Sequence, residues 1–400
     1  MKLRSAILAA PILLSGCVTA LGPASPPQAA SHAWISFDRQ KVTARGADGL
    51  ADRSRQRALT SADPVRIASV SKLVVALGVM RLVEQGRLDL DRDVSEVLGW
   101  KLRNPSFPDR PITLRLLLSH QSSLRDGIDY AIPLGTELRT ALAAPAAYDQ
   151  EHSPGTYFRY SNLNFPVVAS VMELAGGERF DRLMDRLVLA PLGLEACFNW
   201  STCSDATVAR AVVLYGEDGA VLRDDLSGRR PACPALAPAG LPCDLSGYRI
   251  GSNGALFSPQ GGLRISAEGL SVIGRLLLNR GMVNGKRFLS EASIQAMLAP
   301  HWRFNGTNGE TEDDFYCGYG LAVQILPNPG CRDDILGNAT PLVGHAGNAY
   351  GVKSGLWIDR RRGAGMAYFA TGIAEDAPKG ETSYRSIEEW LARRAAQARP

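Results

Sequence analysis

The segment SVSKLVVALGVMRLVEQ, residues 69–85, carries the clearest periodic pattern in the 400-residue chain. Its apolar side chains recur at steps of three and four residues, at Leu73, Ala76, Leu77, Met80 and Val83. This spacing predicts an amphipathic helix over residues 69–85. Gly86 follows the pattern and is expected to end the helix.

Ser69 and Lys72 stand three residues apart at the start of this helix, so their side chains share one face. A serine hydroxyl becomes a nucleophile when a neighbouring group removes its proton, and Lys72 can do so or can tune the group that does. The free N–H groups of the first turn would stabilise an oxyanion. The alternative is a capping serine and a surface lysine, but Lys72 lies inside the apolar run Ile67–Val75.

Tyr160-Ser161-Asn162 is a second motif with groups suited to catalysis. A tyrosine near a lysine ammonium has its phenolate favoured, so Tyr160 is a candidate general base. Asn162 can donate to a substrate carbonyl and accept from Lys72. The alternative is a buried tyrosine followed by an Asx turn.

Gly344-His345-Ala346-Gly347 is a third motif, placed before two predicted hairpin strands. Its small residues would let a substrate backbone approach the edge of a sheet closely. His345 could then reach the oxygen of Tyr160. The alternative is that His345 is a lone core histidine.

The remaining pattern predicts strands at both ends of the chain and helices between them. Strands are expected at 34–43, 319–325, 351–358 and 365–370, with turns at 46–49 and 359–363 and a closing helix at 383–398. The simplest assembly is an α/β (α+β) fold. One antiparallel sheet is built from both chain ends and covered by the first and last helices, with a mostly helical lobe inserted. We place the α/β lobe at about 32–85 and 315–400 and the helical lobe at about 86–314.

Taken together and in this order, the three motifs resemble those of the serine β-lactamase and penicillin-binding peptidase superfamily. Within it the chain is most similar to the branch of class C β-lactamases, D-Ala-D-Ala carboxypeptidases, D-aminopeptidases and related esterases. The likeness extends over residues 32–398 and includes LLLSHQSSL at 116–124, PLGL at 191–194 and GGL at 261–263.

The resemblance implies a role for each motif residue. Ser69 would be the acylated nucleophile, Lys72 and Tyr160 would share proton transfer, and Asn162 would position the acyl amide. The N–H groups of Ser69 and Asn348 would form the oxyanion hole, beside Ala346 and Gly347 at the substrate. His345 stands where family members carry Lys or His, and His120 matches a recurrent histidine that we interpret as structural.

One departure from the family bears on the substrate. Ala346 occupies a position where β-lactamases and carboxypeptidases usually have a hydroxyl that helps to hold a substrate carboxylate. This favours a neutral ester, an amide, or a peptide recognised at its amino end over a β-lactam. The alternative is that Asn348 or Lys353 holds a carboxylate instead. We therefore expect a serine hydrolase acting on a small molecule or peptide, with peptidoglycan-derived peptides included. The alternatives are a β-lactamase and a non-catalytic peptidoglycan-binding lipoprotein.

Residues 1–16 have the pattern of a bacterial export signal, with Lys2 and Arg4 before a short apolar run. The run ends in Leu14-Ser15-Gly16-Cys17, which resembles a lipobox and predicts cleavage before a lipid-modified Cys17. The alternative is a plain signal cut near Ala20 or later. Residues 17–31 are predicted to be a tether, and Val18 favours the outer membrane. The expected location is the bacterial periplasm, lipid-anchored.

Six of the seven cysteines remain if Cys17 is the anchor, and six allow 15 pairings. Their sequential spacing favours Cys197–Cys203, Cys233–Cys243 and Cys317–Cys331, although some could be free thiols. No CxxC is present, so we expect no metal, and no motif points to another cofactor. The composition is that of a soluble globular enzyme. The net charge of +4 gives no reason to expect nucleic acid, and we expect a monomer.

Overall fold

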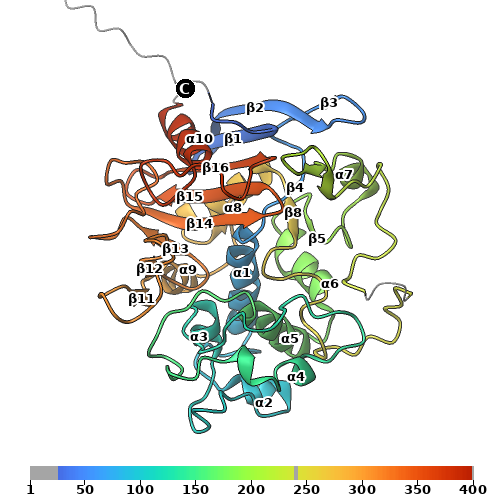
Figure 1. Ribbon diagram of the computed structural model, residues 1–400, viewed down its shortest axis with the longest axis vertical. Coiled ribbons are helices and arrows are strands. Elements are labelled where there is room, and N and C mark those ends of the chain that lie inside the picture. The colour runs from blue at the N-terminus through green and yellow to red at the C-terminus, as the bar shows by residue number, and fades with distance from the viewer. Residues whose placement is uncertain (1–25, 238–241, 399–400) are drawn as a thin grey trace, which may run out of the picture.

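The computed structural model describes residues 26–237 and 242–398 (Figure 1). The predicted signal peptide, Cys17 and most of the predicted tether lie outside the described residues. No helix in the described part of the chain combines the length and the apolar character needed to cross a bilayer.

A nine-stranded antiparallel sheet forms the upper half of the molecule in Figure 1 and confirms the predicted fold class. Its strands come from both ends of the chain, and the first strand pairs with the last along its whole length. The order is β11 (Trp302–Arg303), β12 (Gly318–Tyr319), β13 (Gln324–Leu326), β14 (Leu342–Ala349), β15 (Val352–Asp359), β16 (Ala364–Thr371), β1 (Ser31–Asp38), β2 (Val42–Asp52) and β3 (Arg57–Ala58).

Two helices cover the sheet on opposite faces. Alternate residues of β15 point to opposite faces of the sheet. Leu356 belongs to the cluster of buried hydrophobic residues that includes those of α8 (Ala267–Leu278). Trp357 belongs to the separate cluster that includes those of α10 (Ser386–Gln397). The prediction that the first and last helices cover the sheet is therefore wrong for the first. Its place on the sheet is taken by α8, which lies within residues 86–314.

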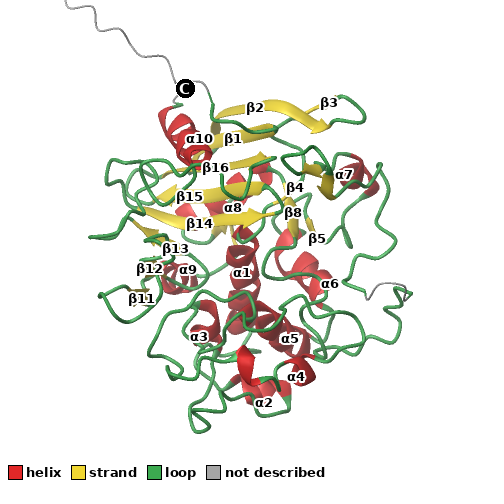
Figure 2. Cartoon of the chain, viewed as in Figure 1, coloured by secondary structure: helices red, strands yellow, loops and turns green. Residues whose placement is uncertain are grey.

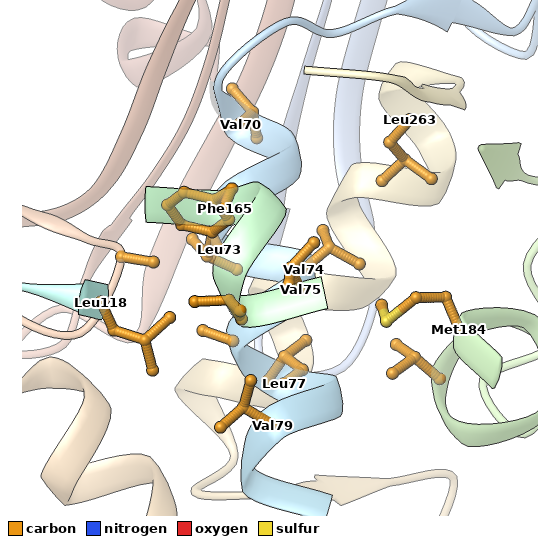
Figure 3. Packing of buried hydrophobic residues seen from close by; sticks show 14 of the residues in the cluster. Val70, Leu73, Val74, Val75, Leu77, Val79, Leu118, Phe165, Met184 and Leu263 are labelled. Atoms are coloured by element: carbon orange, nitrogen blue, oxygen red, sulfur yellow. The ribbon is translucent and has the colours of Figure 1, made fainter. Parts of the chain in front are cut away.

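The predicted helix at 69–85 is present as α1 (Val70–Glu84), but it is not amphipathic. Twelve of its fifteen residues are buried. Figure 3 shows why: Leu118, Phe165, Met184 and Leu263, from four other segments, surround it on several sides. A helix that is apolar nearly all round is a central one, and this burial fixes Ser69 and Lys72 at the middle of the molecule.

The other helices and short strands complete the structure (Figure 2). The helices are α2 (Val94–Leu98), α3 (Leu114–Leu118), α4 (Leu138–Ala141), a 3₁₀ turn (Pro145–Ala147), α5 (Asn164–Gly176), α6 (Phe180–Met184), a π-helical turn (Asp185–Leu189), α7 (Asp205–Ala209) and α9 (Glu291–Leu298). The strands are β4 (Val65–Arg66), β5 (Cys197–Phe198), β6 (Leu214–Tyr215), β7 (Val221–Arg223), β8 (Leu263–Ile265), β9 (Met282–Val283) and β10 (Lys286–Arg287).

Two local predictions at strands were wrong. Residues 46–49 are part of β2 and not a turn, because Gly46 lies under the ring of Trp34, where an added Cβ would come within 2.6 Å. Residues 319–325 are not one strand but the hairpin β12–β13. The third motif, 344–347, precedes the hairpin strands β15 and β16 as predicted, and it lies in a strand of its own, β14, that was not predicted.

All three expected disulfides are present: Cys197–Cys203, Cys233–Cys243 and Cys317–Cys331. In the described part of the chain, the side chains gathered at metal-ligand spacing are Asp314 with Cys317 and Cys331. Both sulfurs of that group are already bonded to each other, so they are not available as thiolate ligands.

Candidate active site

Ser69 and Lys72 meet at the N-terminus of α1, as their spacing predicted. Lys72 is fully buried, and its Nζ donates to Ser69 Oγ at 3.0 Å, to Asn162 Oδ1 at 2.8 Å and to the Gln260 carbonyl at 3.0 Å. Burial lowers the pKa of Lys72 to about 7, although Asp126 and Glu312 favour the ammonium. At neutral pH a large fraction of Lys72 is therefore the free amine, which can accept a proton.

Tyr160 lies beside this pair, but its phenolate is not favoured as predicted. Lys72 Nζ lies 4.9 Å from the centre of the Tyr160 ring and so faces the ring rather than its oxygen. Burial raises the pKa of Tyr160 above its ordinary value, although the Ser69 and Tyr316 hydroxyls act in the opposite direction. The buried hydroxyl has no well-formed hydrogen bond, so Tyr160 is a protonated group able to donate.

Two aromatic rings stack on the ring of Tyr160. His120 stacks on it at 4.4 Å between ring centres and Tyr316 at 4.5 Å. His120 Nδ1 also accepts from the N–H of Ser161 at 3.0 Å. Burial holds the pKa of His120 well below its ordinary value, so the ring is neutral and acts as a packing and hydrogen-bonding support, in line with the structural role assigned to it.

Asp126 is a site residue that the sequence reasoning missed. Its carboxylate accepts four hydrogen bonds from one turn: Ser161 Oγ at 2.8 Å, Asn162 N at 3.0 Å, Asn162 Nδ2 at 2.9 Å and Leu163 N at 2.9 Å. Because it holds the Nδ2 of Asn162, it directs the Oδ1 of that side chain toward Lys72. A lone aspartate 35 residues from its partners gives no local signal.

We expect Asp126→Ala to lower kcat/KM for an ester substrate by about 10- to 100-fold, since losing hydrogen bonds to a charged group costs about 1.5–3 kcal/mol each and displaces Asn162. Steady-state kinetics would measure it. Asp129→Ala is the matched control, because among the described residues the Asp129 carboxylate accepts its hydrogen bond within its own turn, from Ala131 N. Equal losses in both variants would contradict the role of Asp126.

The ring centre of His345 lies 6.2 Å from that of Tyr160, but its nitrogens bond to other groups and not to the Tyr160 oxygen, and His345 is not among the residues that line the cavity. It is fully buried: Nδ1 donates to the Ala346 carbonyl at 2.5 Å, and Nε2 accepts from the Tyr319 hydroxyl at 2.7 Å. Burial, together with the charge of Lys72, lowers its pKa to about 3. His345 is thus a neutral core histidine throughout the physiological range, which is the alternative the sequence left open.

The rest of the third motif lies at the open edge of β14. The N–H of Ala346 points toward β13, where it donates to Gln324 Oε1 at 2.8 Å. Because N–H groups alternate in direction along a strand, the N–H of Asn348 points to the same side as the N–H of Ala346. The pairing of β14 with β13 ends at Gly344, before Asn348 is reached. Gly347 faces α1: an added Cβ would lie 3.2 Å from the backbone nitrogen of Ser69.

A cavity of about 750 Å³ opens over these residues. Ser69, Tyr160, Asn162, Ala346, Gly347 and Asn348 all line it, so six of the predicted site residues meet in one place. The irregular segment 197–260 supplies much of its wall, including Trp200, Arg223 and Cys233. Glu312 lies at the mouth, where the surrounding protein and two other carboxylates raise its pKa to about 7.

Comparisons with known proteins agree with this geometry. A family model described as Beta-lactamase matches residues 28–388. Esterase EstB of Burkholderia gladioli is 34% identical over 176 residues, 39% of this chain and 44% of that protein. The D-alanyl-D-alanine-carboxypeptidase/endopeptidase AmpH of Escherichia coli K12 is 29% identical over 140 residues, 33% of this chain and 35% of that protein.

Among solved structures, the D-amino acid amidase of Ochrobactrum anthropi SV3 superposes with a TM-score of 0.65 at 18% identity, covering 92% of this chain and 93% of that one. At that identity the likeness shows the fold. The chain spans less than half the length of the two curated relatives above. The matched residues 28–388 include Ser69, Lys72 and Tyr160. The chain belongs to the β-lactamase family.

Proposed function

We propose that the protein hydrolyses an ester or amide through an acyl-enzyme on Ser69. One observation carries the proposal: Ser69 Oγ lies 3.0 Å from the Nζ of a fully buried lysine and opens into the cavity. Burying Lys72 is costly, and the burial leaves its amine able to take the serine proton at neutral pH.

The proposed acylation uses groups already in place. Neutral Lys72 takes the proton of Ser69 as Oγ bonds to the substrate carbonyl carbon and the carbonyl electron pair moves to oxygen. The N–H groups of Ser69 and Asn348 receive that oxyanion. When the intermediate collapses, the bond to the leaving alcohol or amine breaks. Tyr160 gives that group a proton and regains one from solvent in the cavity, to which Lys72 releases the proton that it took from Ser69. A water molecule then attacks the acyl carbonyl in the place of Ser69, and the bond to the Ser69 oxygen breaks, which frees the serine.

For the substrate we propose a carboxylic ester or an amide of the D-amino-acid peptide kind, with a β-lactam as the less suited candidate. Ala346 offers no hydroxyl to hold a carboxylate at the edge of β14. Relatives named as an esterase, a D-Ala-D-Ala carboxypeptidase and a D-amino acid amidase support both candidate classes.

We also propose that the protein works outside the cytoplasm, as a monomer tethered through a lipid on Cys17, with the outer membrane as its site. The three disulfides support export, because such bonds form in oxidising compartments. Metabolic labelling with a palmitate analogue, in the full chain and in Cys17→Ala, tests the anchor: loss of label in the variant is expected, and an unlabelled full chain would refute it.

Intact-mass spectrometry of the 32–400 domain tests the acyl-enzyme. A fluorophosphonate should add one adduct to the wild type and none to Ser69→Ala, since the variant lacks the nucleophile. Benzylpenicillin in a parallel reaction separates the candidates: a persistent adduct indicates a peptidase-like enzyme, and intact penicillin without an adduct indicates an esterase or amidase. An equal fluorophosphonate adduct on Ser69→Ala would overturn the proposal, because the reactive nucleophile would then be another residue. Peptidoglycan-fragment binding with no adduct from any acyl donor would favour a non-catalytic protein.

A further inference from the structure

Two arginines of the cavity wall converge on one tyrosine. The guanidinium carbon of Arg66 lies 5.0 Å from the centre of the Tyr350 ring, and that of Arg223 lies 4.8 Å from it. All three residues line the cavity. Arg66 comes from β4, three residues before Ser69, and Arg223 ends β7. Segments far apart in the sequence thus bring two positive charges to one place.

Neither guanidinium has an ion-pair partner among the described residues. Arg66 is only 9% exposed. Its Nη1 donates to the Gly261 carbonyl at 3.0 Å, and its buried Nε has no partner. Asp224 is the carboxylate that acts on Arg66, and it already pairs with Arg264 at 2.8 Å and accepts from the Trp200 indole at 2.9 Å.

Arg66 and Arg223 repel each other, although Asp224 offsets part of the positive charge at Arg66, and a buried polar group without a partner is costly. Burial and the charge of Arg264 lower the pKa of Arg66 to about 9, so it still carries its charge at neutral pH. A planar guanidinium fork matches the two oxygens of a carboxylate. The missing partner in this part of the cavity is therefore an anionic group on the substrate.

The place of the arginines also says which part of the substrate carries that group. The leaving group must depart toward the residue that protonates it, which is Tyr160. The aromatic rings around Tyr160 are those of His120, Tyr316, Tyr319 and His345, and in the described part of the chain no hydrogen bond, ion pair or ring contact joins any of them to Arg66 or Tyr350. The acyl part of the substrate consequently extends the other way, along the end of β14 toward Tyr350.

We propose that Arg66 and Arg223 form a subsite for a carboxylate on the acyl part of the substrate, so that the preferred acyl donor is a half-ester or half-amide of a dicarboxylic acid. This inference rests on the proposed function and specifies its substrate class.

The test compares p-nitrophenyl monoesters of succinate, glutarate and adipate with neutral esters in which a methyl group replaces the free carboxylate. The leaving group is the same throughout, so the ratio of kcat/KM values reports the acyl subsite alone. The wild type should prefer one acidic chain length by tenfold or more. Arg66→Gln should lower that ratio by about 10- to 100-fold and Arg223→Gln by a smaller factor, since Arg223 is exposed.

Lys379→Gln is the matched control, because it removes one positive charge from another part of the cavity wall, where Lys379 pairs with Asp313 at 3.1 Å. Its ratio should change less than threefold. Calorimetric titration of glutarate into Ser69→Ala and into the double variant Ser69→Ala/Arg66→Gln measures binding without turnover. Ser69-dependent hydrolysis with no preference for any acidic ester would overturn this subsite alone, whereas no Ser69-dependent turnover of either series would overturn the proposed function with it.

Discussion

Replacing Lys72 with methionine should lower kcat/KM for an ester by about 10²- to 10⁴-fold, the range that a positioned general base contributes. Methionine matches the length and volume of the buried lysine stem but cannot accept the proton of Ser69. Lys72→Arg should be equally inactive, because guanidinium stays protonated at working pH. Stopped-flow acylation kinetics measure the step directly, and circular dichroism checks folding. Retention of more than a tenth of the activity in both variants would remove Lys72 from the role of base.

The pH profile of the wild type tests the same assignment. The amine of Lys72 is the active form, and its pKa is lowered to about 7. Activity should therefore rise with pH through about 7 and level off above it. His345 should not set the profile, because its pKa lies near 3 and it is neutral throughout this range. His345→Asn should keep the midpoint near 7, and a midpoint that moved or disappeared in this variant would contradict the assignment.

The sequence predicted those parts of the site that depend on local spacing. Ser69 and Lys72 share a helix turn and Asn162 lies in the same tripeptide as Tyr160, so short-range geometry and the family motifs were enough to bring them together. Asp126 and Tyr316 were missed because their roles arise only when a distant loop folds onto the Tyr160 turn. The direction of His345 was wrong because a strand presents alternate residues to opposite faces, and the strand β14 itself was not predicted.

In the fold, too, features set by local sequence were predicted, and features set by contacts between distant segments were not. The hairpin of β15 and β16 was predicted from its turn and its alternating strands. The position of α1 was not, because a three- and four-residue period says which residues share a face and not what covers the others. The burial of α1 depends on Leu118, Phe165 and Leu263, which approach it from separate segments. The same contacts fix the N-terminus of α1 against β14, where the site forms.

Gly347 lies where β14 comes close to the N-terminus of α1, and Gly347→Ala should lower kcat/KM by about 10²-fold or more. An added Cβ would collide with the Ile67 carbonyl and Ser354 Oγ and would lie 3.2 Å from the Ser69 nitrogen. The Ile67 carbonyl is backbone and already accepts from Ser354 Oγ at 2.8 Å, so β14 must move away from α1. That shift separates the N–H groups of Ser69 and Asn348, and one lost oxyanion donor costs about 10²- to 10³-fold.

The variant should also unfold at a lower urea concentration, since overpacking typically costs about 1–3 kcal/mol. Gly247→Ala is the matched control, because a Cβ there would meet no atom within 4 Å. The double variant Gly347→Ala/Ser354→Gly separates the two collisions: it removes the Ser354 hydroxyl and leaves the Ile67 carbonyl. We expect part of the stability to return while activity stays low, since the backbone collision alone still displaces Asn348. Full recovery of activity would show that the side chain, and not the approach of β14 to α1, makes glycine necessary at this position.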